Sequence, residues 1–227
     1  MLLLPFILIL GCGSNPGTNT SVSEKTLLAQ QQRAGAHSAD PAFYNDLGRA
    51  QMTIERYQDA IENFNKAILL DPDNAELYYN RAISYYYLDN HEEAFKDFAR
   101  AIEIDPQYKL AYINRGNVYY NLDMYREALD DFSQALLLEP VTYADYQSRS
   151  NVYIKLGRID EALDDLGNAL ALKPNDQHLL DIRAGIYYHS GRYQEALSDL
   201  LLLIEIEPQT EAYREAIIQI TNILNER

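Results

Sequence analysis

The chain has 227 residues, of which 47% are hydrophobic, so it can bury a full-sized core but has room for only one large domain or two small ones. Its 34 acidic and 19 basic residues give a net charge of -15, which argues against binding of duplex nucleic acid, because that needs a basic face. The single cysteine excludes an internal disulfide and any CxxC metal or redox site.

The first eleven residues are predicted to form a signal peptide. Their apolar run, from Leu2 to Leu10, is too short at ~1.5 Å per residue to cross ~30 Å of hydrocarbon. The letters "ILGC" resemble a bacterial lipobox, although Leu10 is bulkier than usual and no basic residue precedes the run. The resemblance implies that Cys12 becomes the lipidated N-terminus in the cell envelope, on the periplasmic face of the outer membrane if the bacterium has two membranes. A plain signal peptide and an untargeted apolar tail stay open as alternatives.

Residues 12–40 are predicted to be a flexible tether that follows the lipidated cysteine. The stretch is rich in Ser, Thr, Asn, Gln and Gly, and it is poor in branched and aromatic residues. A flexible chain of this length spans about 30 Å. The tether would therefore hold the next domain at about that distance from the bilayer.

From residue 41 the sequence repeats with a period of 34 and no insertion or deletion, in the units 41–74, 75–108, 109–142, 143–176 and 177–210. Each unit contains two amphipathic helical patterns, and a proline column predicts the end of every second helix, because the residue before proline is disfavoured in a helix. Small residues in both helices predict close packing of the pair. The alanine column is Ala60, Ala94, Ala128, Ala162 and Ala196, and the proline column is Pro72, Pro106, Pro140, Pro174 and Pro208.

One such hairpin has too little core to be stable alone, so stacking is required. The sequence therefore predicts an all-α fold, a right-handed superhelical solenoid of five helix-turn-helix repeats. Residues 211–227 carry an apolar stripe, which predicts a C-terminal capping helix. The columns resemble the tetratricopeptide repeat (TPR), which implies this fold and a role in protein binding without naming a partner. The family's aromatic column is Tyr44, Tyr78, Tyr112 and Tyr146, with Leu180 as a departure, and the stripe is Tyr213, Ile217, Ile220 and Leu224.

An arginine column occupies a position where the family usually has leucine. Four units carry both this arginine and an aspartate in the second helix, whereas the first unit lacks both and has Leu47 and Asn63. Joint presence and absence predict ion pairs within each unit, and a ligand-binding role for the arginines is the alternative. The predicted pairs are Arg81–Asp97, Arg115–Asp131, Arg149–Asp165 and Arg183–Asp199.

The side of each first helix opposite its buried stripe is predicted to line a concave groove. In the third unit the stripe is centred on Tyr112, Gly116 and Tyr119. Tyrosine and asparagine on the open side suit an extended peptide, although neighbouring first helices could instead bury the tyrosines against each other. This groove set is Asn45, Arg49, Tyr79, Ile83, Tyr86, Tyr87, Ile113, Asn117, Tyr120, Asn121, Gln147, Asn151, Ile154, Tyr188 and His189.

Nothing in the sequence favours catalysis, a metal, a cofactor or a small-molecule substrate. His178 and His189 lie about 16 Å apart along one predicted helix, too far to share a metal. Tyr79, Ile113 and Asp181 stand where a carboxylate clamp would need lysine. We therefore predict no enzyme but a membrane-anchored scaffold that binds a segment of another envelope or periplasmic protein. The alternative is an assembly factor resembling the pilotins of secretion and pilus systems, which would act through oligomerisation or subunit docking.

Overall fold

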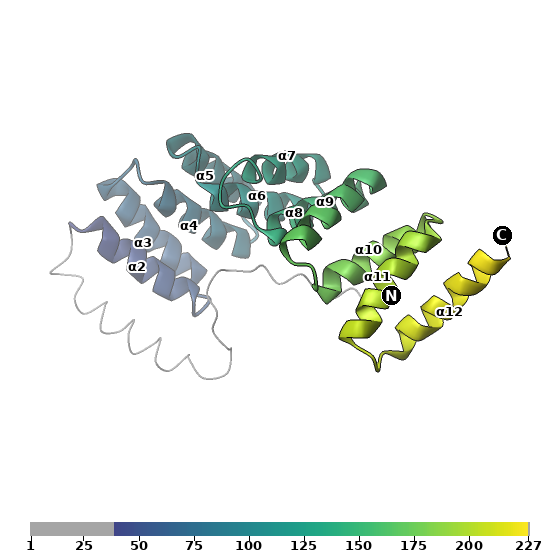
Figure 1. Cartoon of the computed structure of the whole chain (residues 1–227). Helices are drawn as coiled ribbons and strands as arrows, with labels where there is room; N and C mark the ends of the chain where they lie inside the picture. Colours follow the sequence, from purple (N-terminus) through teal and green to yellow (C-terminus); the bar gives the residue numbers. More distant parts are fainter. Residues whose placement is uncertain (1–38, 227) are drawn as a thin grey trace. The chain divides into compact units, whose positions relative to one another are not determined.

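The computed structural model describes residues 39–226, so the predicted signal peptide, Cys12 and nearly all of the tether lie outside the described residues. Within 39–226 the regular structure consists of α-helices without strands, which confirms the predicted all-α class (Figure 1). No helix in this part of the chain is long and apolar enough to cross a membrane. The helices are α2 (Pro41–Met52), α3 (Tyr57–Leu70), α4 (Ala75–Tyr87), α5 (His91–Ile104), α6 (Lys109–Asn121), α7 (Tyr125–Ala135), α8 (Tyr143–Lys155), α9 (Ile159–Leu172), α10 (Gln177–His189), α11 (Tyr193–Ile206) and α12 (Glu211–Asn225).

The chain forms two compact units, which meet in sequence between Val118 and Tyr119. In the first unit α2 packs on α3 and α4 packs on α5, while α3 joins the two hairpins by packing on α4. In the second unit α8 pairs with α9 and α10 with α11, and α12 packs on α11. Each hairpin named here corresponds to one 34-residue repeat.

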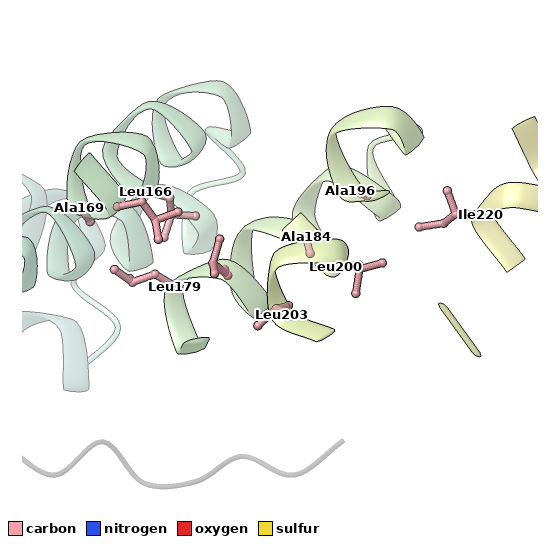
Figure 2. Close-up of a cluster of buried hydrophobic side chains, with 10 residues drawn as sticks. Leu166, Ala169, Leu179, Ala184, Ala196, Leu200, Leu203 and Ile220 are labelled. Atoms are coloured by element: carbon pink, nitrogen blue, oxygen red, sulfur yellow. The ribbon is translucent and has the colours of Figure 1, made fainter. Parts of the chain in front are cut away.

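The core of the second unit shows how stacking buries what a single hairpin leaves open. Its fully buried side chains come from α9, α10, α11 and α12, and they include Leu166, Leu179, Leu203 and Ile220 (Figure 2). Apolar residues on the stripe of α12 pack against the same cluster. The terminal helix therefore covers the last hairpin and removes its apolar face from water.

Polar side chains at the repeat boundaries begin the first helices. Asp40 accepts a hydrogen bond from the Ala42 amide at 3.0 Å. In the same way Asn74 accepts from the Glu76 amide at the start of α4, and Asp176 accepts from the Leu179 amide at the start of α10. These acceptors satisfy amides that have no partner inside the helix, so each boundary is specified locally.

Four of the five second helices end two residues before the proline of their repeat. The exception is α7, which ends at Ala135, well before Pro140, so the predicted end of the third unit's second helix is wrong. The amide of Leu137 donates to the Gln134 carbonyl, and the amide of Leu138 donates to the Ala135 carbonyl. These tighter three-residue bonds replace the α-helical pattern before proline could end it.

A residue with positive φ forms the turn of every hairpin, and it is Glu55, Asp89, Asp123, Gly157 or Gly191, with φ between 58° and 73°. We expect Gly157→Ala to lower the free energy of unfolding by about 1 kcal/mol, because an L side chain disfavours this left-handed backbone. An added Cβ at Gly157 meets no heavy atom within 4 Å, so urea denaturation would report the backbone conformation alone. The control is Gly185→Ala in α10, which is also open and should not destabilise. Equal losses in both variants would contradict the interpretation.

Candidate functional site

The structure contains three of the four predicted arginine–aspartate pairs. Each arginine donates through Nε and Nη2 to the two carboxylate oxygens, a bidentate geometry that adds strength and fixes orientation. The pairs are Arg81–Asp97 at 2.6 and 2.7 Å, Arg149–Asp165 at 2.8 and 2.8 Å, and Arg183–Asp199 at 2.8 and 2.7 Å. The fourth pair, Arg115–Asp131, stays a prediction because its members belong to different units.

The first hairpin replaces the ion pair with a neutral contact. Its arginine position is the buried Leu47, and its aspartate position is Asn63. The Asn63 amide group donates to Gln51 Oε1 at 2.7 Å, and both side chains are buried. The polar side chain at this position of the second helix, whether aspartate or asparagine, therefore has a hydrogen-bond partner within its own hairpin.

Two further arginines stack on tyrosines, which the sequence reasoning missed. Arg158 lies 4.7 Å from the ring centroid of Tyr153 and also donates to Glu161 at 2.8 Å. Arg149 lies over the same ring at 5.6 Å, so Tyr153 contacts two guanidinium groups. The fifth hairpin repeats the arrangement with Tyr187, Arg183, Arg192 and Glu195. The recurrence of arginine, tyrosine and glutamate at a spacing of 34 was the signal that could have revealed it.

Removing the arginine of the pair in the second hairpin should make the stability of the protein depend on pH. Burial raises the pKa of the Asp97 carboxyl above its ordinary value, and Arg81 opposes that shift. Without the arginine the pKa rises further. A raised pKa in the folded state means stability that is present at acidic pH and lost as pH rises through that pKa. We therefore expect Arg81→Leu to cost much less stability at about pH 4 than near neutral pH, measured by thermal unfolding. In Arg81→Leu/Asp97→Asn this difference between the two pH values should vanish. If it persists, the carboxyl group of Asp97 is not the cause of the pH dependence.

One member of the groove set in the first unit is not open. Ile83 is only 6% exposed, so its predicted place in a groove is wrong. The reason is that α4 is an inner helix, which packs on α5 of its own hairpin and also on α2 and α3 of the preceding one. A helix with neighbours on several sides buries a wider arc than one stripe.

Other members of the set are engaged with the next hairpin. Asn45 donates to Glu76 Oε1 at 3.3 Å and accepts from Asn80 at 3.0 Å, while Arg49 pairs with the same carboxylate at 3.2 Å. Since Asn45 lies on α2 and its partners lie on α4, this polar network connects consecutive first helices.

Tyr79 is also a packing residue. Its ring contacts Phe98 and Tyr108 edge to face, and burial raises the pKa of its hydroxyl to about 12. Asn114 donates to this hydroxyl at 3.0 Å from α6. Asn114 was not among the predicted residues; its signal was the 35-residue offset that it shares with the Asn45–Asn80 contact.

Aromatic residues near the ends of the first helices pack on the first residue of the second helix. The ring centroids of Tyr86 and His91 lie 5.8 Å apart in the second hairpin, and those of Tyr188 and Tyr193 lie 5.7 Å apart in the fifth. Tyr120 and Tyr125 form an edge contact with ring centroids 5.6 Å apart, as Tyr188 and Tyr193 do. These rings are half-buried rather than wholly free, so part of their surface serves the hairpin.

The last residues of these first helices remain at the surface. Tyr87, Asn121, Lys155 and His189 are exposed and share one column, which we call the helix-end row. Tyr87 also stacks on Tyr57 of the preceding hairpin, with centroids 4.7 Å apart and planes 10° apart. The other members of the groove set, Ile113, Asn117, Gln147, Asn151 and Ile154, are half-buried.

A cavity of about 500 Å³ lies at the start of α4 and contains none of the predicted groove residues. Several of its carboxylates already have partners, since Glu76 pairs with Arg49 and Asp73 with Arg100. Among residues 39–226 no group of three His, Cys, Asp or Glu residues could hold a metal. The cavity is lined by Asp71, Asp73, Asn74, Ala75, Glu76, Ile104, Asp105 and Tyr108.

Comparison with known proteins identifies the family to which the repeats belong. One sequence model of the tetratricopeptide repeat matches residues 45–109 and 148–214, and a second matches residues 110–140. The search of curated proteins gave no match. The crystal structure of MamA is similar, with 25% identity, a TM-score of 0.62, and coverage of 72% of this chain and 97% of that chain.

Two less identical structures share the fold. YrrB, a TPR protein with an unusual peptide-binding site, has 20% identity and a TM-score of 0.66, over 83% of this chain and 97% of that chain. Pseudomonas aeruginosa pilF has 18% identity and a TM-score of 0.64, over 88% of this chain and 87% of that chain.

Proteins built from these repeats are in general interaction modules that bind proteins or peptides. Since the first sequence model alone matches more than half of its residues, the chain belongs to the tetratricopeptide repeat family.

Proposed function

We propose that this protein is a lipid-anchored scaffold of the bacterial cell envelope, and that the first helices of its hairpins bind an extended segment of a partner protein. The lipobox-like sequence at Cys12 supports the anchor, and the repeat family supports the binding of a protein. The peptide-binding site named for YrrB supports a peptide as the ligand class.

The helix-end row is the observation that carries the proposal. Its exposed side chains stand beside the half-buried Tyr86, Tyr120, Ile154 and Tyr188. Tyrosine offers rigid apolar area with a polar tip, and an amide such as Asn121 can both donate to and accept from a peptide backbone. Because Asn45, Tyr79 and Ile83 are engaged or buried, the binding surface is narrower than the groove set and lies toward the ends of the first helices.

A photoreactive residue tests the surface directly in the native host. We expect a residue placed at Asn121 to capture one partner protein and the same residue at the exposed Glu127 on α7 to capture none. Adding Tyr120→Ala to the variant with the photoreactive residue at position 121 should remove the capture, while the circular dichroism spectrum stays unchanged. Equal capture from both positions would contradict binding at the first helices.

The anchor is tested separately. Cys12→Ser should abolish incorporation of an alkyne-labelled fatty acid and release the protein from the membrane fraction. Labelling that persists in this variant would contradict the lipoprotein assignment without affecting the binding surface.

A second candidate function is that of an assembly factor, and one observation favours it. The last two helices expose Leu201 and Leu202 on α11 and Ile218 on α12, the last at 60% exposure. Exposed apolar side chains at the end of a repeat array can mediate self-association. If sedimentation velocity shows a dimer that Ile218→Glu dissociates, and Asn121 captures only a second copy, the assembly role replaces the scaffold.

A further inference from the structure

Two tyrosines from consecutive hairpins stack face to face in the first unit. Tyr57 is the first residue of α3, and Tyr87 is the last residue of α4. Their ring centroids lie 4.7 Å apart and their planes differ by only 10°, so the faces of the two rings are in contact. The stack therefore joins two hairpins through a pair of side chains that are distant in the sequence but adjacent in the fold.

The backbone beside each ring of the stack is fixed by a hairpin turn. Glu55 and Asp89 have φ of 61° and 58°, and each lies two residues from a stacked tyrosine. The amide of Glu55 donates to the Met52 carbonyl, and the amide of Asp89 donates to the Tyr86 carbonyl, both at 3.0 Å. Each ring is therefore attached to a turn of defined geometry, which limits the ways in which the two rings can meet.

The hydroxyl ends of the two rings lie close to each other. Burial is the main cause of the raised pKa of both hydroxyls, and the charge that Tyr87 carries when ionised raises the pKa of Tyr57 further. Glu55 raises the pKa of both. Such effects require short distances, because water screens charges that lie far apart. Tyr87 is also 37% exposed and Tyr57 is half-buried, so a small reagent reaches the edge of the stack.

We propose that Tyr57 and Tyr87 are a site of oxidative cross-linking, at which hydrogen peroxide and a haem peroxidase join the two rings into dityrosine. Each hydroxyl gives up one electron and one proton, and the two phenoxyl radicals then form a carbon–carbon bond between the ring positions next to the hydroxyl-bearing carbons. The hydrogens on these two carbons move to the phenol oxygens, which restores both aromatic rings. The peroxide takes up the two electrons and the two protons and leaves as two molecules of water.

The geometry of the stack favours this pair among the 19 tyrosines of the chain. In the second unit Tyr120 and Tyr125 meet at 64°, and Tyr188 and Tyr193 meet at 72°, both edge to face. The new bond forms along the π orbitals, which point toward each other in stacked rings, whereas in an edge-to-face pair those of one ring point away. The cross-link would tie α3 to α4 covalently and stabilise the first unit by removing conformations from the unfolded chain, as a disulfide does.

Oxidation of the purified full chain tests the site. The chain would be treated with hydrogen peroxide and a haem peroxidase at low protein concentration, and the monomer would be analysed by dityrosine fluorescence, intact mass and peptide mapping. We expect a monomer that has lost two hydrogen atoms and contains one link, between Tyr57 and Tyr87. The same treatment in urea should distribute the links over other tyrosines, because the stack requires the folded first unit.

Tyr57→Phe is the decisive variant. Phenylalanine keeps a ring that stacks on Tyr87 but cannot form dityrosine, so we expect the dityrosine fluorescence of the monomer to be lost while the circular dichroism spectrum stays unchanged. The variant also leaves Tyr86 beside Tyr87, so it distinguishes the expected link from one between these neighbours. Tyr125→Phe is the matched control, which removes one hydroxyl of an edge-to-face pair and should retain the full yield.

Three results would overturn the inference. They are equal losses of dityrosine in the two variants, dityrosine formed only between molecules, and a peptide map of the oxidised chain without the link between Tyr57 and Tyr87. The cross-link does not depend on the proposed scaffold function, since no partner protein enters the experiment.

Discussion

Replacing Arg149 with leucine is expected to lower the free energy of unfolding by about 3–5 kcal/mol. The carboxylate of Asp165, with a side chain only 3% exposed, would lose both of its 2.8 Å bonds to the guanidinium and remain buried without a counter-charge. Arg149 also covers Tyr153, so its removal exposes part of that ring. Urea denaturation followed by circular dichroism measures the loss.

A double-mutant cycle separates the pair from the packing. Arg149→Leu/Asp165→Leu removes both charges, so we expect it to be more stable than Arg149→Leu alone, because no uncompensated carboxylate is left. Lys96→Ala is the surface control: Lys96 forms two pairs, but they are exposed, so its loss should hardly change stability. Strictly additive losses in the cycle would show that Arg149 and Asp165 do not stabilise each other.

Gly48→Ala is expected to destabilise the first hairpin by about 1–3 kcal/mol. A Cβ at Gly48 would lie 2.6 Å from Cε1 of Phe64, closer than two carbons can approach, and Phe64 is completely buried. The ring cannot swing into solvent, so α2 and α3 must move apart. The fall in the midpoint of thermal unfolding measures this cost.

Gly167→Ala is the matched control for that experiment. Gly167 also lies inside a helix, α9, but an added Cβ there meets no heavy atom within 4 Å. The substitution should raise stability by about 0.5–1 kcal/mol, since alanine loses less conformational entropy than glycine in a helix. If both alanine variants change stability in the same direction, the close approach of Gly48 and Phe64 is not what requires glycine.

Much of this protein follows from short-range patterns in its sequence. The 34-residue period marks the repeats, and polar residues such as Asp40 and Asn74 begin first helices where they can accept amide hydrogen bonds. The joint presence of arginine and aspartate predicted contacts that the structure contains, for example Arg183 with Asp199. These features are predictable because each depends on residues within one hairpin, where the spacing along the chain sets the spacing in space.

The open surface, by contrast, was decided by how each helix packs against all of its neighbours, within its own hairpin and beyond it. Helix periodicity placed Ile83 and Tyr79 in the groove, yet Ile83 is buried and Tyr79 packs on Phe98 and Tyr108. Periodicity identifies one buried stripe, whereas an inner helix such as α4 has neighbours on several sides. The early end of α7 likewise became known only from the structure. Sequence alone therefore determined the repeat and its internal pairs, while tertiary packing determined which side chains are left for a partner, because burial depends on every helix that comes near.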